Sequence, residues 1–116
     1  MSATVNLVIE KGSTLSHIFY YKDENRVAID LTNYTARMQI RKKYNSTSFI
    51  AELTTGNGGI IITPLEGKIE LYLADTATSA LTDTYGVYDL ELVNSTSGNV
   101  TKLLRGTVTI TEEVTR

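Results

Sequence analysis

The chain has 116 residues, of which 41% are apolar and 21% charged, and its 11 Lys and Arg against 13 Asp and Glu give a formal net charge of −2. This length and apolar content predict one folded domain, residues 1–116, and exclude wholesale disorder. The balanced charge argues against a nucleic-acid partner, which requires a concentrated basic excess. The sequence contains no cysteine, which excludes disulfides and thiolate metal sites.

The first residues, Met1-Ser2-Ala3-Thr4, have neither a basic start nor a long apolar run. No stretch approaches the roughly 18 apolar residues of a membrane-spanning helix. We therefore expect a protein that is made in the cytosol and has no membrane partner.

Apolar and polar residues alternate along the first half of the chain, and this period of two predicts β-strands. A first strand is expected over residues 5–9, and a second over residues 15–21, where apolar residues occupy both faces and leave the core side open. The clearest strand covers residues 34–42, with Ala36, Met38 and Ile40 on one face. Polar turns separate these segments.

Further strands are expected around residues 49–53, 60–62 and 69–73, separated by a glycine-rich turn at 56–59 and a hairpin loop at 64–67. Residues 74–81 have helical character, and Asp75 is expected to cap the start of this helix. The last two strands are predicted over residues 85–93 and 99–111.

These elements predict an all-β fold. The expected architecture is an antiparallel β-sandwich, immunoglobulin-like or related, with about eight strands and one short helical crossover near 75–82. The pattern does not distinguish a sandwich from a distorted barrel. An edge strand such as residues 5–9, or the end around residues 108–114, could pair with a neighbouring molecule by strand addition.

No group of residues predicts a catalytic, cofactor or metal site, and we expect no enzyme activity. His17 is the only histidine, and it lies mid-strand among apolar residues. A catalytic base needs a nucleophile or an orienting carboxylate paired with it, and nothing in the sequence supplies that pairing. Asp89 and Glu91 lie on an outer strand face, where an opposing acidic strand would make them a weak cation site. Asp30 is interpreted as architectural, accepting amide hydrogen bonds at the turn before Tyr34.

The seven tyrosines have two interpretations. Tyrosine is common in strands, but it also favours protein interfaces and sugar-stacking platforms. We take Tyr20, Tyr72, Val114 and Arg116 as candidate interface residues. A glycan ligand is an alternative that no motif supports.

One resemblance covers most of the chain. Its first part is the string Val27-Ala28-Ile29-Asp30-Leu31-Thr32 with Tyr34 and Arg37-Met38-Gln39-Ile40-Arg41, which is similar to the N-terminal β-sandwich of phage baseplate upper proteins. Glu10-Lys11-Gly12-Ser13-Thr14 resembles the lead-in turn of such domains. Leu104-x-Gly106-x-Val108-x-Ile110, with Val114-Thr115-Arg116, resembles their closing strand.

The resemblance implies a non-enzymatic structural protein of a bacteriophage virion, synthesised in the host cytoplasm and acting in the tail, the baseplate or the neck. It implies other virion proteins and symmetric copies of the same chain as partners. The family continues into helical and receptor-holder regions that this sequence does not contain, so no receptor-binding segment carries over. A capsid decoration protein and a carbohydrate-binding module are the alternatives, and a small hydrolase built around His17 is a third.

Overall fold

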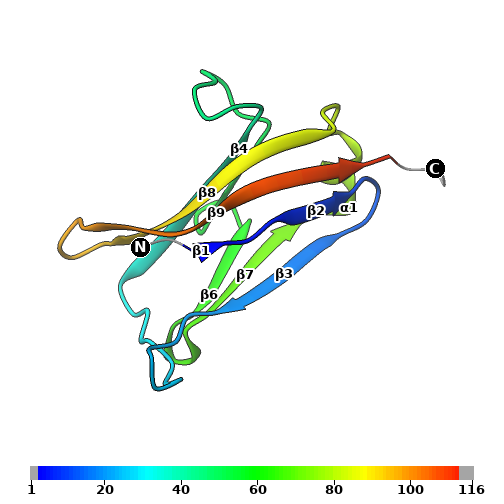
Figure 1. Cartoon of the computed structure of the whole chain (residues 1–116). Coiled ribbons are helices and arrows are strands. Elements are labelled where there is room, and N and C mark those ends of the chain that lie inside the picture. The colour runs from blue at the N-terminus through cyan, green and yellow to red at the C-terminus, as the bar shows by residue number, and fades with distance from the viewer. Residues whose placement is uncertain (1–2, 113–116) are drawn as a thin grey trace.

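The computed structural model describes residues 3–112, which form two β-sheets packed face to face (Figure 1). The strand order is β1-β9-β8-β4-β5 in the larger sheet, where β2 also pairs with β9, and β3-β7-β6 in the smaller. The larger sheet contains β1 (Ala3–Thr4), β2 (Leu7–Glu10), β4 (Tyr34–Arg41), β5 (Ala51–Thr54), β8 (Tyr85–Asn94) and β9 (Val100–Thr111). The smaller contains β3 (Leu15–Tyr20), β6 (Ile60–Thr63) and β7 (Lys68–Leu73). The expected β-sandwich is confirmed.

Two of the segments that carry the resemblance, residues 34–41 and 104–110, lie in β4 and β9 of the larger sheet, with β8 between them. β4 pairs antiparallel with β8, which in turn pairs antiparallel with β9. On its other side β9 pairs with β1 and β2, and this pairing is parallel. At Val108 and Thr109 β9 has a partner strand on both sides, so the expectation that this end of the chain is open to a neighbour is wrong there. The N-terminal strand occupies that edge instead, and β2 lies at the border of the sheet as predicted.

The link between β1 and β2 runs along β9 in the same parallel register as the two strands, and it lies close to Gly106. The Val5 amide donates to the Arg105 carbonyl at 2.9 Å, and the Val5 carbonyl accepts the Tyr88 hydroxyl at 2.7 Å. Gly106 lies opposite Tyr88 in the sheet, and a Cβ there would overlap the Val5 carbonyl group. The glycine in the closing-strand motif is thus explained by the close approach of the N-terminal strand.

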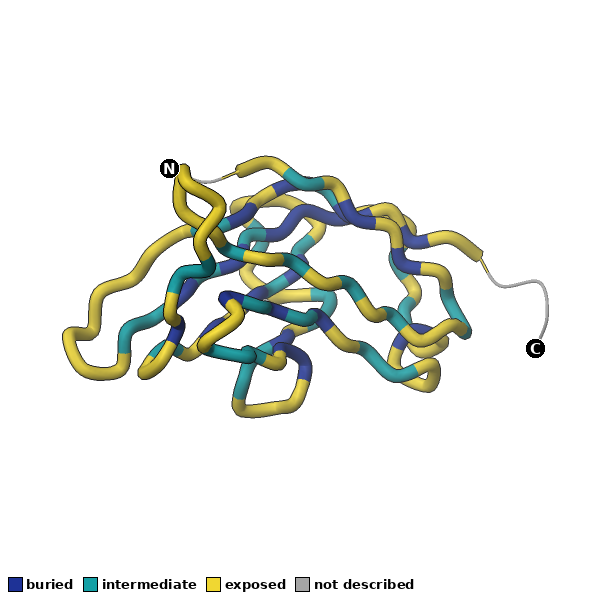
Figure 2. The backbone as a smooth tube through the Cα atoms, turned by 90° about the horizontal axis from the view of Figure 1, so that it is seen from below, coloured by how far each residue is buried: buried dark blue, intermediate teal, exposed yellow. Residues whose placement is uncertain are grey.

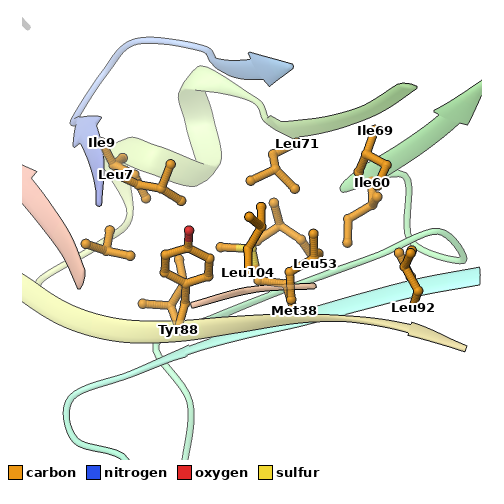
Figure 3. Close-up of a cluster of buried hydrophobic side chains, with 14 of the residues drawn as sticks. Leu7, Ile9, Met38, Leu53, Ile60, Ile69, Leu71, Tyr88, Leu92 and Leu104 are labelled. Atoms are coloured by element: carbon orange, nitrogen blue, oxygen red, sulfur yellow. The ribbon is translucent and has the colours of Figure 1, made fainter. Parts of the chain in front are cut away.

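The core fills the space between the two sheets, and buried and exposed residues alternate along the strands that enclose it (Figure 2). In Figure 3, Ile60, Ile69 and Leu71 of the smaller sheet face Met38 and Leu53 of the larger. Figure 3 also shows the Tyr88 ring within this apolar cluster. The sequence pattern correctly predicts that Ala36, Met38 and Ile40 of β4 share one face, and this face meets the core.

One short helix, α1 (Asp75–Ser79), makes the crossover from β7 to β8, as expected. The predicted cap is wrong, because the N-cap position is Ala74 and Asp75 is the first helical residue. The helix is held to the sandwich by Thr78, which is fully buried. The Thr78 hydroxyl accepts the Gly12 amide at 3.1 Å and donates to the Ser13 carbonyl at 2.8 Å.

The turns lie at the positions that the sequence predicts. A 3₁₀ turn, Pro64–Glu66, joins β6 to β7. In the glycine-rich turn the Asn57 side-chain oxygen accepts the amides of Thr54 and Gly59. Asp30 accepts both the amide and the hydroxyl of Thr32, and these hydrogen bonds hold the pKa of its carboxyl below the ordinary value. Its architectural role is confirmed.

Ionisation of Tyr88 is expected to destabilise the fold at alkaline pH. Burial raises its pKa to about 12 from an ordinary value of 10.0. The folded state therefore holds the phenolic proton more tightly than the unfolded chain. The resulting stabilisation is complete below pH 10 and is lost as the pH rises to about 12. We expect the free energy of unfolding to fall by roughly 2–3 kcal/mol over this range through Tyr88 alone.

The matched variant is Tyr88→Phe, which keeps the ring and removes the ionisation. Its free energy of unfolding should be lower at pH 8 by about 1 kcal/mol, because the Val5 carbonyl loses a partner. Between pH 10 and 12 it should change less steeply than that of the wild type. Parallel slopes in urea titrations of the two proteins would contradict this role for Tyr88.

Candidate functional site

The smaller sheet has one face against the core and one face in solvent. Phe19, Ile69 and Ile62 point into the sandwich, so their neighbours along each strand point out. This settles the orientation of β3 that the sequence left open: Phe19 packs on the core, whereas Ile18 and Tyr20 face solvent. We call the outer surface the small-sheet face, and its residues are Ser16, Ile18, Tyr20, Ile61, Thr63, Lys68, Glu70 and Tyr72.

Large apolar side chains are exposed on this face. The exposed fraction is 45% for Ile18, 48% for Ile61, 55% for Tyr20 and 39% for Tyr72. Ile18 and Ile61 flank Glu70 from the two sides of β7, and Tyr20 lies opposite Lys68. A group of half-exposed apolar residues on one face of a sheet is typical of a contact surface, since folding of the isolated domain does not require it.

The two charges on the small-sheet face have no ionic partner within it. Ion pairs among residues 3–112 include neither Lys68 nor Glu70. The Glu70 carboxylate accepts one hydrogen bond, from the Ser16 hydroxyl at 2.9 Å. At the rim, the Lys22 ammonium lies 5.6 Å from the centre of the Tyr20 ring.

On the outer face of the larger sheet, by contrast, acidic and basic side chains form ion pairs with one another. The Glu91 carboxylate lies 2.7 Å from Arg37 and 2.7 Å from Lys102, and Lys102 also contacts Asp89 at 3.1 Å. The condition for a weak cation site at Asp89 and Glu91, an opposing acidic strand, is not met, because the neighbouring strands bring Arg37 and Lys102 to these carboxylates. No group of three or more His, Asp or Glu residues that could hold a metal occurs between residues 3 and 112.

This network predicts a loss of stability in acid. The hydrogen bond from Lys102, assisted by one from Arg37, holds the pKa of Glu91 below its ordinary value of 4.5 despite partial burial. The stabilisation is therefore complete above pH 4.5 and disappears as the pH falls through the lower folded-state value. Glu91→Gln should lower the free energy of unfolding at pH 7 by about 1 kcal/mol and reduce its fall below pH 4.5. Identical acid profiles for the variant and the wild type in urea unfolding would contradict the network.

The hollows on the surface are shallow. One, of about 380 Å³, lies on the larger sheet between β5, β4 and β8 and is lined mainly by the charged network with Gln39 and Glu52. Another, of about 330 Å³, opens between β1, the end of β3 and β9, and its walls include Phe19, Tyr21 and Leu103. Neither brings a nucleophile, a base and an orienting group together.

His17 is half-buried on β3, where its ring packs against Phe19 with the centroids 4.5 Å apart. This is a structural environment. The hydrolase interpretation requires a hydroxyl and a carboxylate beside the His17 ring. The neighbouring pair, Ser16 and Glu70, lies on the solvent face of the sheet, whereas His17 points to the core side with Phe19.

The candidate interface residues divide into two groups. Tyr20 and Tyr72 both lie on the small-sheet face, as an interface role requires. Val114 and Arg116 lie outside the described residues. Tyr44 and Tyr85 are exposed elsewhere, and Tyr88 is buried, so the tyrosines do not gather on one face as a sugar platform would need.

Sequence reasoning missed Ile18, Ile61 and Lys68 as surface residues of one face, although the alternation along residues 69–73 places Glu70 and Tyr72 outward. A signal was present, because three consecutive isoleucines at residues 60–62 place an apolar side chain on the solvent side of any strand. The same applies to the apolar run at residues 18–21. The alternation of apolar and polar residues does not reveal that β3 and β6 both pair with β7.

Comparisons with known proteins identify the fold and no family. The chain is similar to one in a crystal structure of a chicken TCR, with a TM-score of 0.57 at 11% identity over 95% of this chain and 54% of that chain. It therefore spans about half the length of that neighbour. No protein-family model matches the chain, and no curated protein matches its sequence. Among residues 3–112 no helix is long and apolar enough to cross a membrane. At this identity the likeness shows the fold alone, and the chain is an immunoglobulin-like β-sandwich.

Proposed function

We propose that this chain is a non-enzymatic structural protein of a bacteriophage virion, a component of the tail, the baseplate or the neck that acts through protein–protein contacts. The observation that supports contact as its function is the small-sheet face, with four half-exposed apolar side chains around two unpaired charges. The kind of assembly rests on the resemblance of residues 27–41 and 104–110 to baseplate sandwich domains.

Two physical features suit this proposal. Among residues 3–112 the sandwich buries 17 apolar residues, and no side chain of the small-sheet face belongs to this set. A partner that covers Ile18, Ile61, Tyr20 and Tyr72 removes apolar surface from water, which is the main driving force for association. In a particle built from repeated copies, weak contacts of this kind add up through avidity.

The proposal is tested by locating the protein in intact particles. An antibody raised against the purified chain should label phage from the source at the tail, the baseplate or the neck in immunogold microscopy. Pre-absorption with the purified protein serves as the control for specificity. Label over the head would support capsid decoration instead, and protein found only in the lysate would overturn the virion role.

A further inference from the structure

We propose that the small-sheet face binds the same face of a second copy across a two-fold axis, with Lys68 of each copy paired to Glu70 of the other. This inference rests on the proposed role in protein contacts and names the partner of that surface. Three observations carry it: the order of the charges on β7, the residues beside them, and the contrast with the larger sheet.

Lys68 and Glu70 are two residues apart on β7 and point to the same side of the sheet. Along a strand this spacing is about 6.8 Å, which is farther than a direct ion pair but suited to two parallel contacts with another strand. Both side chains are partly buried by their apolar neighbours, and neither belongs to an ion pair within residues 3–112. A partner that supplies opposite charges at the same spacing would satisfy both.

A second copy supplies this spacing when a two-fold axis crosses β7 between Lys68 and Glu70. The rotation reverses the strand direction, so that Lys68 lies over Glu70 and Glu70 over Lys68. On β3 it brings Tyr20 over Ile18 and Ile18 over Tyr20, because these residues lie opposite Lys68 and Glu70 in the sheet. On β6 it places Thr63 over Ile61 by the same register. Each charge then meets its opposite, and the apolar side chains of β3 meet one another.

The charges also exclude the other simple arrangement. An axis parallel to β7 would place Lys68 over Lys68 and Glu70 over Glu70, which is repulsive on both sides. The outer face of the larger sheet offers no comparable pairing, since Arg37, Lys102, Glu91 and Asp89 already neutralise one another. The charge pattern therefore selects both the face and the direction of packing, while the apolar residues supply most of the affinity.

The contact is small, because it comprises three short strands on each copy. We therefore expect association in the micromolar range or weaker, and sedimentation measurements should extend to about 1 mM. The wild type should sediment as a monomer–dimer equilibrium. Lys68→Glu and Glu70→Lys should each raise the dimer dissociation constant at least tenfold, because each variant places like charges across both ion-pair contacts.

The decisive sample is an equimolar mixture of the two single variants. Each contact in the mixed dimer joins an acidic copy to a basic one, so mixing should restore dimers that neither variant forms alone. Lys102→Glu on the larger sheet is the matched control and should dimerise like the wild type. Thermal unfolding of each single variant checks that the fold is intact, and restoration on mixing requires folded proteins.

A wild type that is monomeric up to about 1 mM would overturn the two-fold contact, as would single variants that dimerise normally or a mixture that stays monomeric. Failure of the two-fold contact can be distinguished from failure of the proposed virion role. Immunogold label on particles from a protein that is monomeric in solution would retain the virion role and assign the small-sheet face to a different virion protein.

Discussion

Replacing Gly106 with alanine is expected to lower the free energy of unfolding by about 3 kcal/mol or more. The added Cβ would overlap the carbonyl group of Val5, whose carbon would be only 2.8 Å away, and would also approach the Asn6 side-chain oxygen at 3.0 Å. The Val5 carbonyl belongs to the backbone, so it cannot move aside by a change of rotamer as a flexible side chain can. The N-terminal link must therefore lift from β9, which also breaks the hydrogen bond between Tyr88 and Val5.

Gly56→Ala is the matched control, because a Cβ there would meet only the Thr54 hydroxyl at an ordinary 3.7 Å. This variant should remain within about 0.5 kcal/mol of the wild type. Thermal unfolding should show a decrease in Tm of roughly 10–20 °C for Gly106→Ala and little change for Gly56→Ala. Equal stabilities of the two variants would contradict the close approach of the N-terminal strand to Gly106 of β9.

Substitutions on the two sides of β7 should have very different effects. Leu71 is fully buried between His17 and Ile60 in the sheet register, whereas the next residue, Tyr72, faces solvent. Leu71→Ala removes buried apolar volume and should cost about 3 kcal/mol. Tyr72→Ala should cost less than about 1 kcal/mol, because no part of the core depends on its ring.

Urea unfolding of both variants measures this difference directly. Its consequence for function is that the small-sheet face can vary with little loss of stability, so loss of a binding activity in Tyr72→Ala would report contact and not misfolding. A destabilisation of Tyr72→Ala as large as that of Leu71→Ala would show that this face is structural. It would remove the main support for an interaction surface.

Much of the fold was predictable because strand periodicity depends directly on burial. In β4, Ala36, Met38 and Ile40 alternate with polar residues, and the structure buries these three as expected. The turn role of Asp30 was predictable for a similar reason, since a short carboxylate reaches amides only two residues away. Local chemistry determines both features.

Features that depend on long-range pairing were not predictable. The parallel pairing of the N-terminal strand with β9 joins residues about one hundred positions apart, and no local pattern encodes it. Lys102 beside Asp89 and Glu91 is a similar case, because two acidic residues on one strand say nothing about the strand that follows. The small-sheet face likewise appears only when β3 and β6 are placed on either side of β7.

The central claim, that this chain acts through the small-sheet face in a phage particle, is tested most directly by incorporation. Tagged wild type, Ile18→Asp with Ile61→Asp, and Thr35→Asp with Thr109→Asp as an exposed control on the larger sheet would be supplied in separate infections. Tagged protein that sediments with purified particles is then measured. We predict that the wild type and the control pair are incorporated and that the Ile18 and Ile61 variant is not; equal incorporation of all three would contradict the claim.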